Sequence, residues 1–315
     1  MSSQGGEYER VADEAIPSRK CEISDFNIFT LVKEGKFNRE YLASCDGDKQ
    51  LQIYRMKFIP KQVRYGSETI DSIRKFKTEK MVLEMATSYS FLMGLHASYN
   101  LPFGYILVTK DIGRRNLSDY IEGKSISNGR IAFYAAEIIL AINFLHRNDI
   151  VHRGICPKNI LLDDGHIKLS NFATCKKLGK GKRTKSICGT PLYRAPEMIG
   201  SRNYDFSVDW WSFGIILYQL IVRKNPYIEV IDANIDSKYL INRAILNEAP
   251  YIPLHLSSAT STILSGFLKK NPRERLGCDP GNYPWDIMFH SYFKDINWEM
   301  LEQRKIKPPH KRKRK

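Results

Sequence analysis

The sequence lacks most of the features that mark a special class of protein. Its six cysteines show no C-x-x-C spacing, which argues against a disulfide framework or zinc site and predicts reduced thiols in a cytosolic or nuclear protein. No apolar run approaches about 20 residues, so we expect no transmembrane helix. The first fifteen residues are polar and acidic, which excludes a secretory signal. We find no internal repeat, and no low-complexity segment apart from a basic end.

What is present is ordinary for a globular protein, except for the charge. The chain has 315 residues, is 43% hydrophobic and 26% charged, and is long enough for two lobes. Its net charge is +15, and residues 301–315 hold eight Lys and Arg against one Glu. This end and the basic run 176–185 are interpreted either as solvated surface or as contact sites for anionic lipid, nucleic acid or an acidic partner. Residues 310–315 also match a nuclear import signal.

The hydrophobic pattern changes along the chain. Short apolar runs predict strands at 25–43, around a turn near 34–38, and at 51–60, 89–99 and 104–109, with one helix at 72–87. The pattern then becomes helical: apolar residues share one face after an N-cap at Asn128, and 208–222 is apolar nearly all round, as in a buried helix. Further helices are expected at 236–247 and 258–269. A small sheet with one helix is therefore expected to precede a larger helical part.

Residues 150–176 carry the most informative motifs. His152-Arg153-Gly154 is followed five residues later by Asn159, and a predicted hairpin leads to Asn171-Phe172-Ala173. This frame resembles the catalytic segment of protein kinases, H-R-D-x-K-P-x-N joined to D-F-G. Other motifs resemble the same family in the same order. They are 188–197 (C-G-T-P-L-Y-R-A-P-E), Asp209-x-Trp211-x-x-x-Gly214 and Asn271-Pro272-x-x-Arg275.

Residues 24–310 are therefore similar to the AGC group of protein kinases, and most similar to the protein kinase C catalytic domain. The resemblance implies an α+β, two-lobed kinase fold with a small β-rich N-lobe and a larger, mainly helical C-lobe. It divides the chain into a flexible arm at 1–23, the N-lobe at 24–109, the C-lobe at 110–293 and an AGC-type tail at 294–315 that ends in the basic cluster.

The resemblance also shows which chemical groups are missing. The catalytic aspartate of the family falls on Gly154, its loop lysine on Cys156 and its metal-binding aspartate on Asn171. No catalytic residue is intact, although a nucleophilic Cys156 is an open alternative. Asn159 and Asn171 would make a weak magnesium site, because Mg²⁺ usually takes at least one carboxylate.

The implied nucleotide cleft is altered as well. Lys57 and Glu79 match an ion pair of the family, which either keeps its chemical role or only braces the helix. Of the family's three loop glycines only Gly35 remains. Glu40 and Arg55 replace two apolar residues that lie against adenine, and we hypothesise that they pair across two strands and fill the cleft. Alternatively, both side chains extend into solvent. Val32 and Thr109 complete the set of expected cleft residues.

Positions that hold the family's scaffold are kept. Arg153 and Asp209 are expected to hold the catalytic loop, and Glu197 is expected to pair with Arg275. Ser186 lies where AGC kinases carry the activation-segment phosphate, with Arg153 placed to receive it. An unmodified serine is the alternative.

These residues favour a catalytically impaired pseudokinase that acts as a scaffold or competitor in signalling. The alternatives are a weakly active ATP-dependent serine/threonine kinase and a basic nuclear binding module. No cofactor is expected, or ATP and Mg²⁺ if activity remains. Expected partners are signalling proteins, including an upstream kinase that acts on Ser186, and an acidic partner or nucleic acid at the basic tail. We expect a cytoplasmic or nuclear monomer.

Overall fold

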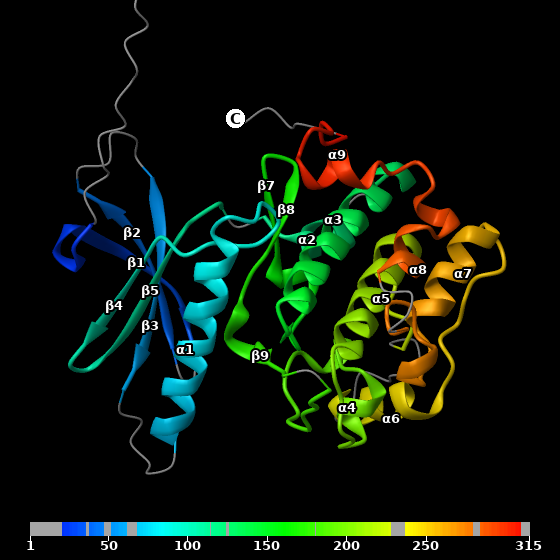
Figure 1. The fold of residues 1–315 in the computed structure, drawn as a ribbon, viewed down its shortest axis with the longest axis horizontal. Helices are drawn as coiled ribbons and strands as arrows, with labels where there is room; N and C mark the ends of the chain where they lie inside the picture. The colour runs from blue at the N-terminus through cyan, green and yellow to red at the C-terminus, as the bar shows by residue number, and fades with distance from the viewer. Residues whose placement is uncertain are drawn as a thin grey trace, which may run out of the picture.

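The computed structural model describes residues 21–35, 38–46, 52–61, 68–113, 115–123, 126–179, 181–227, 237–279 and 284–309. Figure 1 shows two lobes, a sheet with one long helix on one side and a helical lobe on the other. The predicted two-lobed α+β fold is confirmed. The expected arm lies mostly outside the described residues, and so does the proposed import signal at 310–315.

The N-lobe is built on a five-stranded antiparallel sheet in the order β1-β2-β3-β5-β4. Its strands are β1 (Phe26–Glu34), β2 (Arg39–Cys45), β3 (Ile53–Pro60), β4 (Ala97–Leu101) and β5 (Gly104–Lys110). The helix α1 (Glu68–Ala86) packs against β3. In the register of β2 with β3, Glu40 lies opposite Lys57 and Leu42 opposite Arg55. Residues two apart share a face of a strand, so Glu40 is a diagonal neighbour of Arg55.

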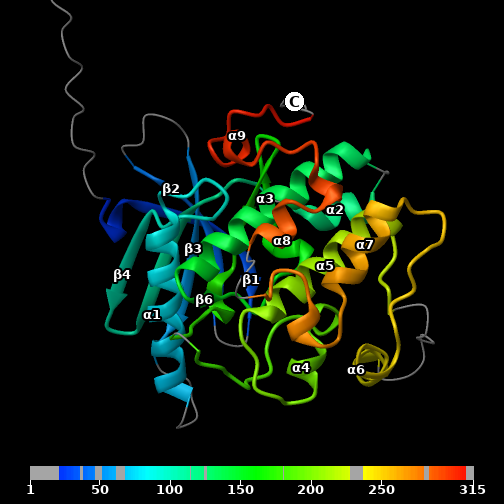
Figure 2. The same ribbon diagram turned by 45° about the vertical axis from the view of Figure 1, so that its right-hand side comes forward.

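The C-lobe is mainly helical. Its helices are α2 (Leu117–Glu122), α3 (Asn128–Arg147), α4 (Pro196–Ile199), α5 (Ser207–Val222), α6 (Ser237–Asn247), α7 (Ser258–Phe267), α8 (Trp285–Met288) and α9 (Trp298–Glu302). Two short antiparallel pairs complete it: β6 (Ile150–Val151) with β9 (Lys176–Lys177), and β7 (Ile160–Asp163) with β8 (His166–Leu169). The C-terminal α9 lies against α3 (Figure 2).

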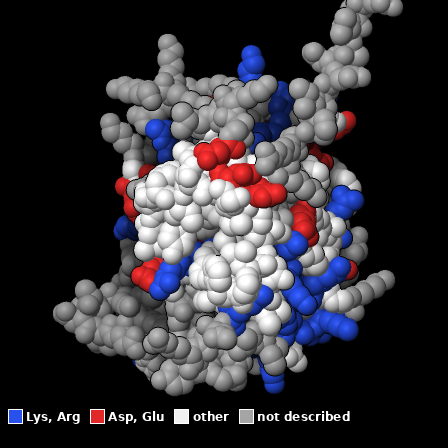
Figure 3. Space-filling view, turned by 90° about the vertical axis from the view of Figure 1, so that its left-hand side faces the viewer, with Lys and Arg blue, Asp and Glu red and all other residues white. Residues whose placement is uncertain are grey.

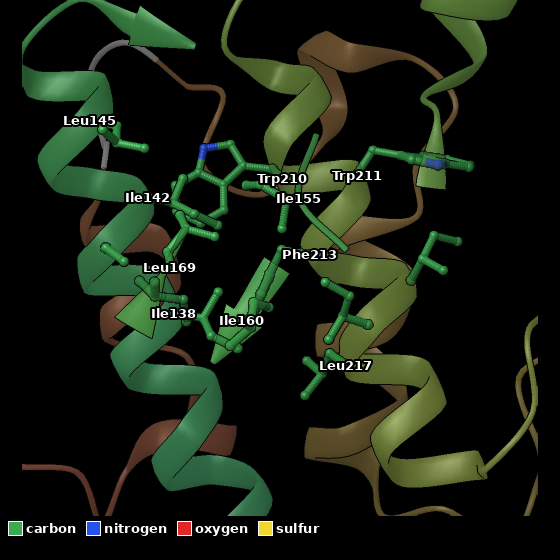
Figure 4. Close-up of a cluster of buried hydrophobic side chains, with 14 of the residues drawn as sticks. Ile138, Ile142, Leu145, Ile155, Ile160, Leu169, Trp210, Trp211, Phe213 and Leu217 are labelled. Carbon is green, nitrogen blue, oxygen red and sulfur yellow. The ribbon is translucent and has the colours of Figure 1, made fainter. Parts of the chain in front are cut away.

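The core of the C-lobe lies between α3 and α5. Ile138, Ile142 and Leu145 of α3 face Trp210 and other side chains of α5, with the β7–β8 hairpin beside them (Figure 4). The apolar face predicted for α3 and the buried helix predicted over 208–222 are both confirmed, because these side chains are buried. Among the described residues, α3 is long and apolar enough to cross a membrane, which the prediction missed. However, 72% of that stretch is buried in the fold, as in a core helix.

Three boundaries predicted from the sequence are wrong. The strand expected over 89–99 is a connecting segment until Ala97, because Leu169 N–H donates to the Phe91 carbonyl and Met93 N–H donates to the Leu169 carbonyl, which joins this segment to β8. Helix α1 begins at Glu68, four residues before the predicted start, and Ser127 occupies the N-cap position of α3, so Asn128 is its first residue. Apolar runs do not distinguish a buried linker from a strand.

Charge is unevenly distributed on the face of the N-lobe. Figure 3 shows uncharged side chains across its centre, Asp and Glu towards the top, and Lys and Arg gathered at the lower right. In addition, Lys176 and Lys177 line a cavity together with Arg74 and Lys75. On the face shown, Lys and Arg are therefore concentrated in one region.

Candidate functional site

A cleft of about 330 Å³ lies between the lobes, at the lower end of the usual size of a small-molecule site. Most residues expected from the sequence line it: Val32, Glu40, Arg55, Lys57, Glu79, Thr109, Asn159 and Asn171. The exception is Gly35, whose backbone N–H donates to the Asn38 carbonyl, 2.8 Å away, and which does not line the cleft. The remaining loop glycine therefore closes a turn of the chain, away from the cavity.

An ion-pair network occupies one wall of the cleft. Arg55 Nη1 lies 3.3 Å from Glu40 Oε2, so the predicted pairing of these side chains is confirmed. Arg55 Nη2 also donates to Asp111 Oδ1 at 2.9 Å, a contact not foreseen from the sequence. The three side chains are between 13% and 27% exposed, so the guanidinium is held by two carboxylates in a mostly buried setting. Two bonds fix Arg55 in the cleft and exclude its extension into solvent.

The ion pair between β3 and α1 is intact. Lys57 Nζ lies 2.8 Å from both carboxylate oxygens of Glu79. The Lys57 side chain is 11% exposed and that of Glu79 is 6% exposed, so the pair is shielded from water. This contact holds α1 against the sheet, and it also places an ammonium group in the cleft. The geometry is compatible with both roles considered from the sequence.

Asp209 of α5 holds the backbone of the catalytic-loop segment. Its carboxylate accepts hydrogen bonds at 2.8 Å from the backbone N–H groups of His152 and Arg153, and at 2.9 Å from His146 Nε2. Burial alone would raise the pKa of Asp209, but the His146 hydrogen bond and the charges of both histidines outweigh it and lower the pKa. The carboxylate therefore stays ionised inside the lobe, and Arg153 is held with a positive φ of 63°.

The position of the missing catalytic aspartate is filled by a neighbour. A Cβ added at Gly154 would collide with the Thr174 hydroxyl oxygen. That hydroxyl donates to the His152 carbonyl at 3.0 Å, so it is fixed where it lies. Cys156 is 5% exposed and does not line the cleft, which argues against a nucleophilic role for its thiol. The loop offers no side-chain base at this point.

The two candidate metal ligands bond to each other. Asn171 Nδ2 donates to Asn159 Oδ1 at 3.2 Å, and Asn159 Nδ2 donates to the Gly154 carbonyl at 2.8 Å. The three carboxylates among the described residues of the cleft are Glu40, Glu79 and Asp111. Each of them is paired with Arg55 or Lys57. No unpaired carboxylate among these lining residues is therefore left to hold a divalent cation.

The ion pair between α4 and the loop after α7 is deeply buried. Arg275 donates to Glu197 through Nη1 at 2.8 Å and Nη2 at 3.1 Å, and its side chain is fully buried. The same guanidinium bonds the Ser207 carbonyl at 2.7 Å and lies over the Trp211 ring. The predicted contact is confirmed, and Arg275 Nε also donates to the Lys269 carbonyl at 3.1 Å, so each nitrogen of the guanidinium has a partner.

Ser186 lies beside a basic cavity of about 590 Å³. Arg153 Nη1 donates to the Ser186 hydroxyl at 2.7 Å, and Arg74, Lys75 and Lys176 line the same cavity. Burial lowers the pKa of Lys176, and the nearby positive charges of Arg153 and Arg74 lower it further. An anion bound in this cavity would reduce the repulsion between these positively charged side chains.

Several residues of the cleft were missed by the reasoning from sequence. Asp111 and Lys158 both line it, and Thr174 fills the space next to Gly154. Asp111 follows directly after β5, so its position at the end of a cleft strand was a usable signal. The role of Thr174 depends on a contact across twenty residues, and no local pattern shows it.

Comparison with known proteins identifies relatives of the whole folded region. The Protein kinase domain family matches residues 30–293. The chain is 35% identical over 291 residues to rabbit (Oryctolagus cuniculus) protein kinase C zeta type, covering 91% of this chain and 48% of the relative. It is 36% identical over 301 residues to atypical protein kinase C of Drosophila melanogaster, covering 93% and 48%. A second Drosophila protein, protein kinase C, is 34% identical over 94% of this chain and 39% of its own length. The chain thus spans less than half the length of these relatives.

Proposed function

The chain belongs to the protein kinase domain family, and we propose that it is a catalytically impaired, protein kinase C-like member, a pseudokinase. In this proposal the folded domain binds partners as a scaffold, or competes with active relatives for them. One observation carries it: the space where the family has its catalytic aspartate holds Gly154 and the fixed hydroxyl of Thr174. Without an acceptor for the substrate proton, a contribution of about 10²–10⁴-fold to the rate is lost.

The cofactor site supports the same proposal. Asn159 and Asn171 offer amide oxygens, and each amide is already used in a hydrogen bond. These residues do not fit a magnesium ion, which needs oxygen ligands with negative charge. Arg55, held by Glu40 and Asp111, occupies a wall on which an adenine would lie. Each 1.36 kcal/mol added to the activation free energy slows a reaction tenfold. If each of these positions loses a few kcal/mol of transition-state stabilisation, the turnover that remains is negligible.

A weakly active serine/threonine kinase is the second candidate. The intact pair of Lys57 with Glu79 favours it, because a shielded ammonium in the cleft can bind an anionic group. The ordered loop around Arg153 and Ser186 also favours it, since an upstream kinase could place a phosphate there. In this alternative ATP and Mg²⁺ are the cofactors.

A basic binding module directed to the nucleus is the third candidate. It rests on the composition of 310–315, which lie outside the described residues. The strong salt dependence expected for phosphate contacts would distinguish it from the other two. A cytoplasmic or nuclear location fits all three candidates.

Thermal unfolding with ATP, with and without Mg²⁺, tests the proposal. A ligand at about 100 times its Kd stabilises a protein by about 2.7 kcal/mol, which is a shift of several degrees in Tm. We expect no magnesium-dependent shift and no transfer of radiolabelled phosphate to a peptide. The matched variant is K57A. A magnesium-dependent shift in the natural chain, together with phosphate transfer that K57A abolishes, would overturn the proposal in favour of an active kinase.

A further inference from the structure

Two cysteines from separate parts of the N-lobe meet at one point. Cys21 lies just before a short 3-10 helix (Ile23–Asp25), and Cys45 is the last residue of β2. Their sulfur atoms are 2.9 Å apart and are not joined by a disulfide bond. A disulfide bond is about 2.05 Å long, so the sulfurs need to approach by less than 1 Å. We propose that Cys21 and Cys45 form a reversible disulfide that ties the start of the domain to its sheet.

The contacts around the pair hold both cysteines in place. Phe26 pairs with Cys45 in the register of β1 with β2, and Asp46 N–H donates to the Asp25 carbonyl at 2.7 Å. On the other side, the Tyr99 hydroxyl donates to the Cys21 carbonyl at 2.6 Å. The backbone on each side is therefore fixed by strand pairing or hydrogen bonds, and bond formation requires only a small adjustment of the side chains.

Solvent exposure assigns an order to the two thiols. Cys21 is partly exposed, while Cys45 is 7% exposed in the small core of the sheet. A small disulfide such as oxidised glutathione therefore reacts first at Cys21. The Cys21 thiolate attacks one sulfur, a mixed disulfide forms and one glutathione thiolate leaves. The Cys45 thiolate then attacks Cys21 Sγ and releases the second glutathione, so that two protein thiols are oxidised while one glutathione disulfide is reduced to two thiols.

The surroundings indicate equilibrium exchange, not rapid peroxide sensing. Acidic residues follow both cysteines in the chain, Glu22 after Cys21 and Asp46 after Cys45, whereas fast-reacting cysteines have electropositive surroundings. The pair is thus suited to follow the thiol–disulfide balance of its surroundings over a long period.

The bond would act on the stability of the N-lobe. It closes a loop across 24 residues, which restricts the unfolded chain, and it covers the core formed by Phe26, Tyr54 and Met56. For a loop of this length we expect Tm to rise by about 6 °C on oxidation. The cleft lies between the lobes, and neither cysteine lines it. This inference is therefore independent of whether the chain is a pseudokinase.

The test equilibrates the full chain in glutathione buffers from fully reduced to fully oxidised, followed by an acid quench, denaturation and alkylation of free thiols. Intact mass should show a fall from six free thiols to four, and a non-reducing peptide map should recover one cross-linked peptide that joins Cys21 to Cys45. The C21S variant should keep all five of its thiols, and C45S should form no cross-link, because its Cys21 stops at the mixed disulfide with one glutathione. C278S is the matched control and should fall from five to three. Six thiols that stay reduced in the most oxidising buffer, or a bond between other cysteines, would overturn the proposal. The map of the natural chain decides the result even if a variant does not fold.

Discussion

Removing the ion pair of Glu40 and Arg55 from the cleft should restore nucleotide binding if these two side chains exclude adenine. The perturbation is E40V/R55A, which replaces the carboxylate and the guanidinium by small apolar side chains. Both changes are needed. In E40V alone, Arg55 stays bound to Asp111 at 2.9 Å, and in R55A alone two carboxylates are left facing a polyanionic ligand. We expect neither single variant to bind ATP.

The structure sets the magnitude of the effect. In the double variant Asp111 loses its partner, and its side chain is only 13% exposed, so the variant carries a cost in stability. Breaking a partly buried pair costs about 1–3 kcal/mol, and a loss of a few degrees in Tm is expected without ligand. ATP at about 100 times its Kd should stabilise the folded double variant by about 2.7 kcal/mol, which is enough to offset that loss.

The assay is thermal unfolding with increasing ATP in the absence of Mg²⁺, so that the result does not depend on the proposed loss of the metal site. The matched control is K80A/E84A, which removes an ion pair of 3.6 Å from α1 outside the cleft. That variant should show no shift with ATP. If E40V/R55A folds and still shows no shift, or if the natural chain already binds ATP equally well, then Arg55 does not exclude the nucleotide.

Three further predictions concern the C-lobe. Burial lowers the pKa of His152, so the unfolded state binds a proton more readily than the folded state, and the free energy of unfolding should fall below about pH 6.5, by up to about 1.4 kcal/mol per pH unit. In H152F the urea midpoint should vary less with pH. An equal variation would exclude His152 as the cause. G154D should lose about 1–3 kcal/mol in urea unfolding because its Cβ meets the Thr174 hydroxyl, and G154D/T174A should recover most of it, whereas equal losses would contradict this steric account. R275M should lose about 3–5 kcal/mol because Glu197 is left buried and unpaired, and E197L/R275M should be more stable than R275M; a double variant that is no better would mean that the charge is not the cause.

Much of the fold was predictable because it depends on local periodicity. The apolar face of α3 and the all-round apolar α5 were visible as spacings, and both helices form the buried core. The prediction of a strand over 89–99 was wrong because this segment depends on contacts that are distant in the sequence. Its apolar residues are buried by contacts with Leu169 of β8, which lies far along the chain. Burial alone gives the same composition to a strand and to a linker between lobes.

The candidate site divides in the same way. The pairing of Glu40 with Arg55 was predictable, because strand register places their side chains as diagonal neighbours. The participation of Asp111 was not predictable, because it depends on how the chain leaves β5 towards the other lobe. The same holds for Thr174, whose hydroxyl reaches the catalytic loop through the bond to His152. Motifs identify positions, but only the packed structure shows what fills the space where a side chain is missing.

The residues that keep the backbone of the site and those that would do chemistry are physically separable. Asn171 has a φ of 62°, a left-handed conformation that asparagine and aspartate both adopt more readily than most residues. Replacing the family's aspartate by asparagine therefore removes a charge while the turn is preserved. Asp209 likewise fixes the loop through backbone N–H groups, whatever side chain stands at position 154. A domain of this kind can lose its chemistry one side chain at a time and still present the same folded surface to partners. For this reason a kinase fold alone does not establish kinase activity.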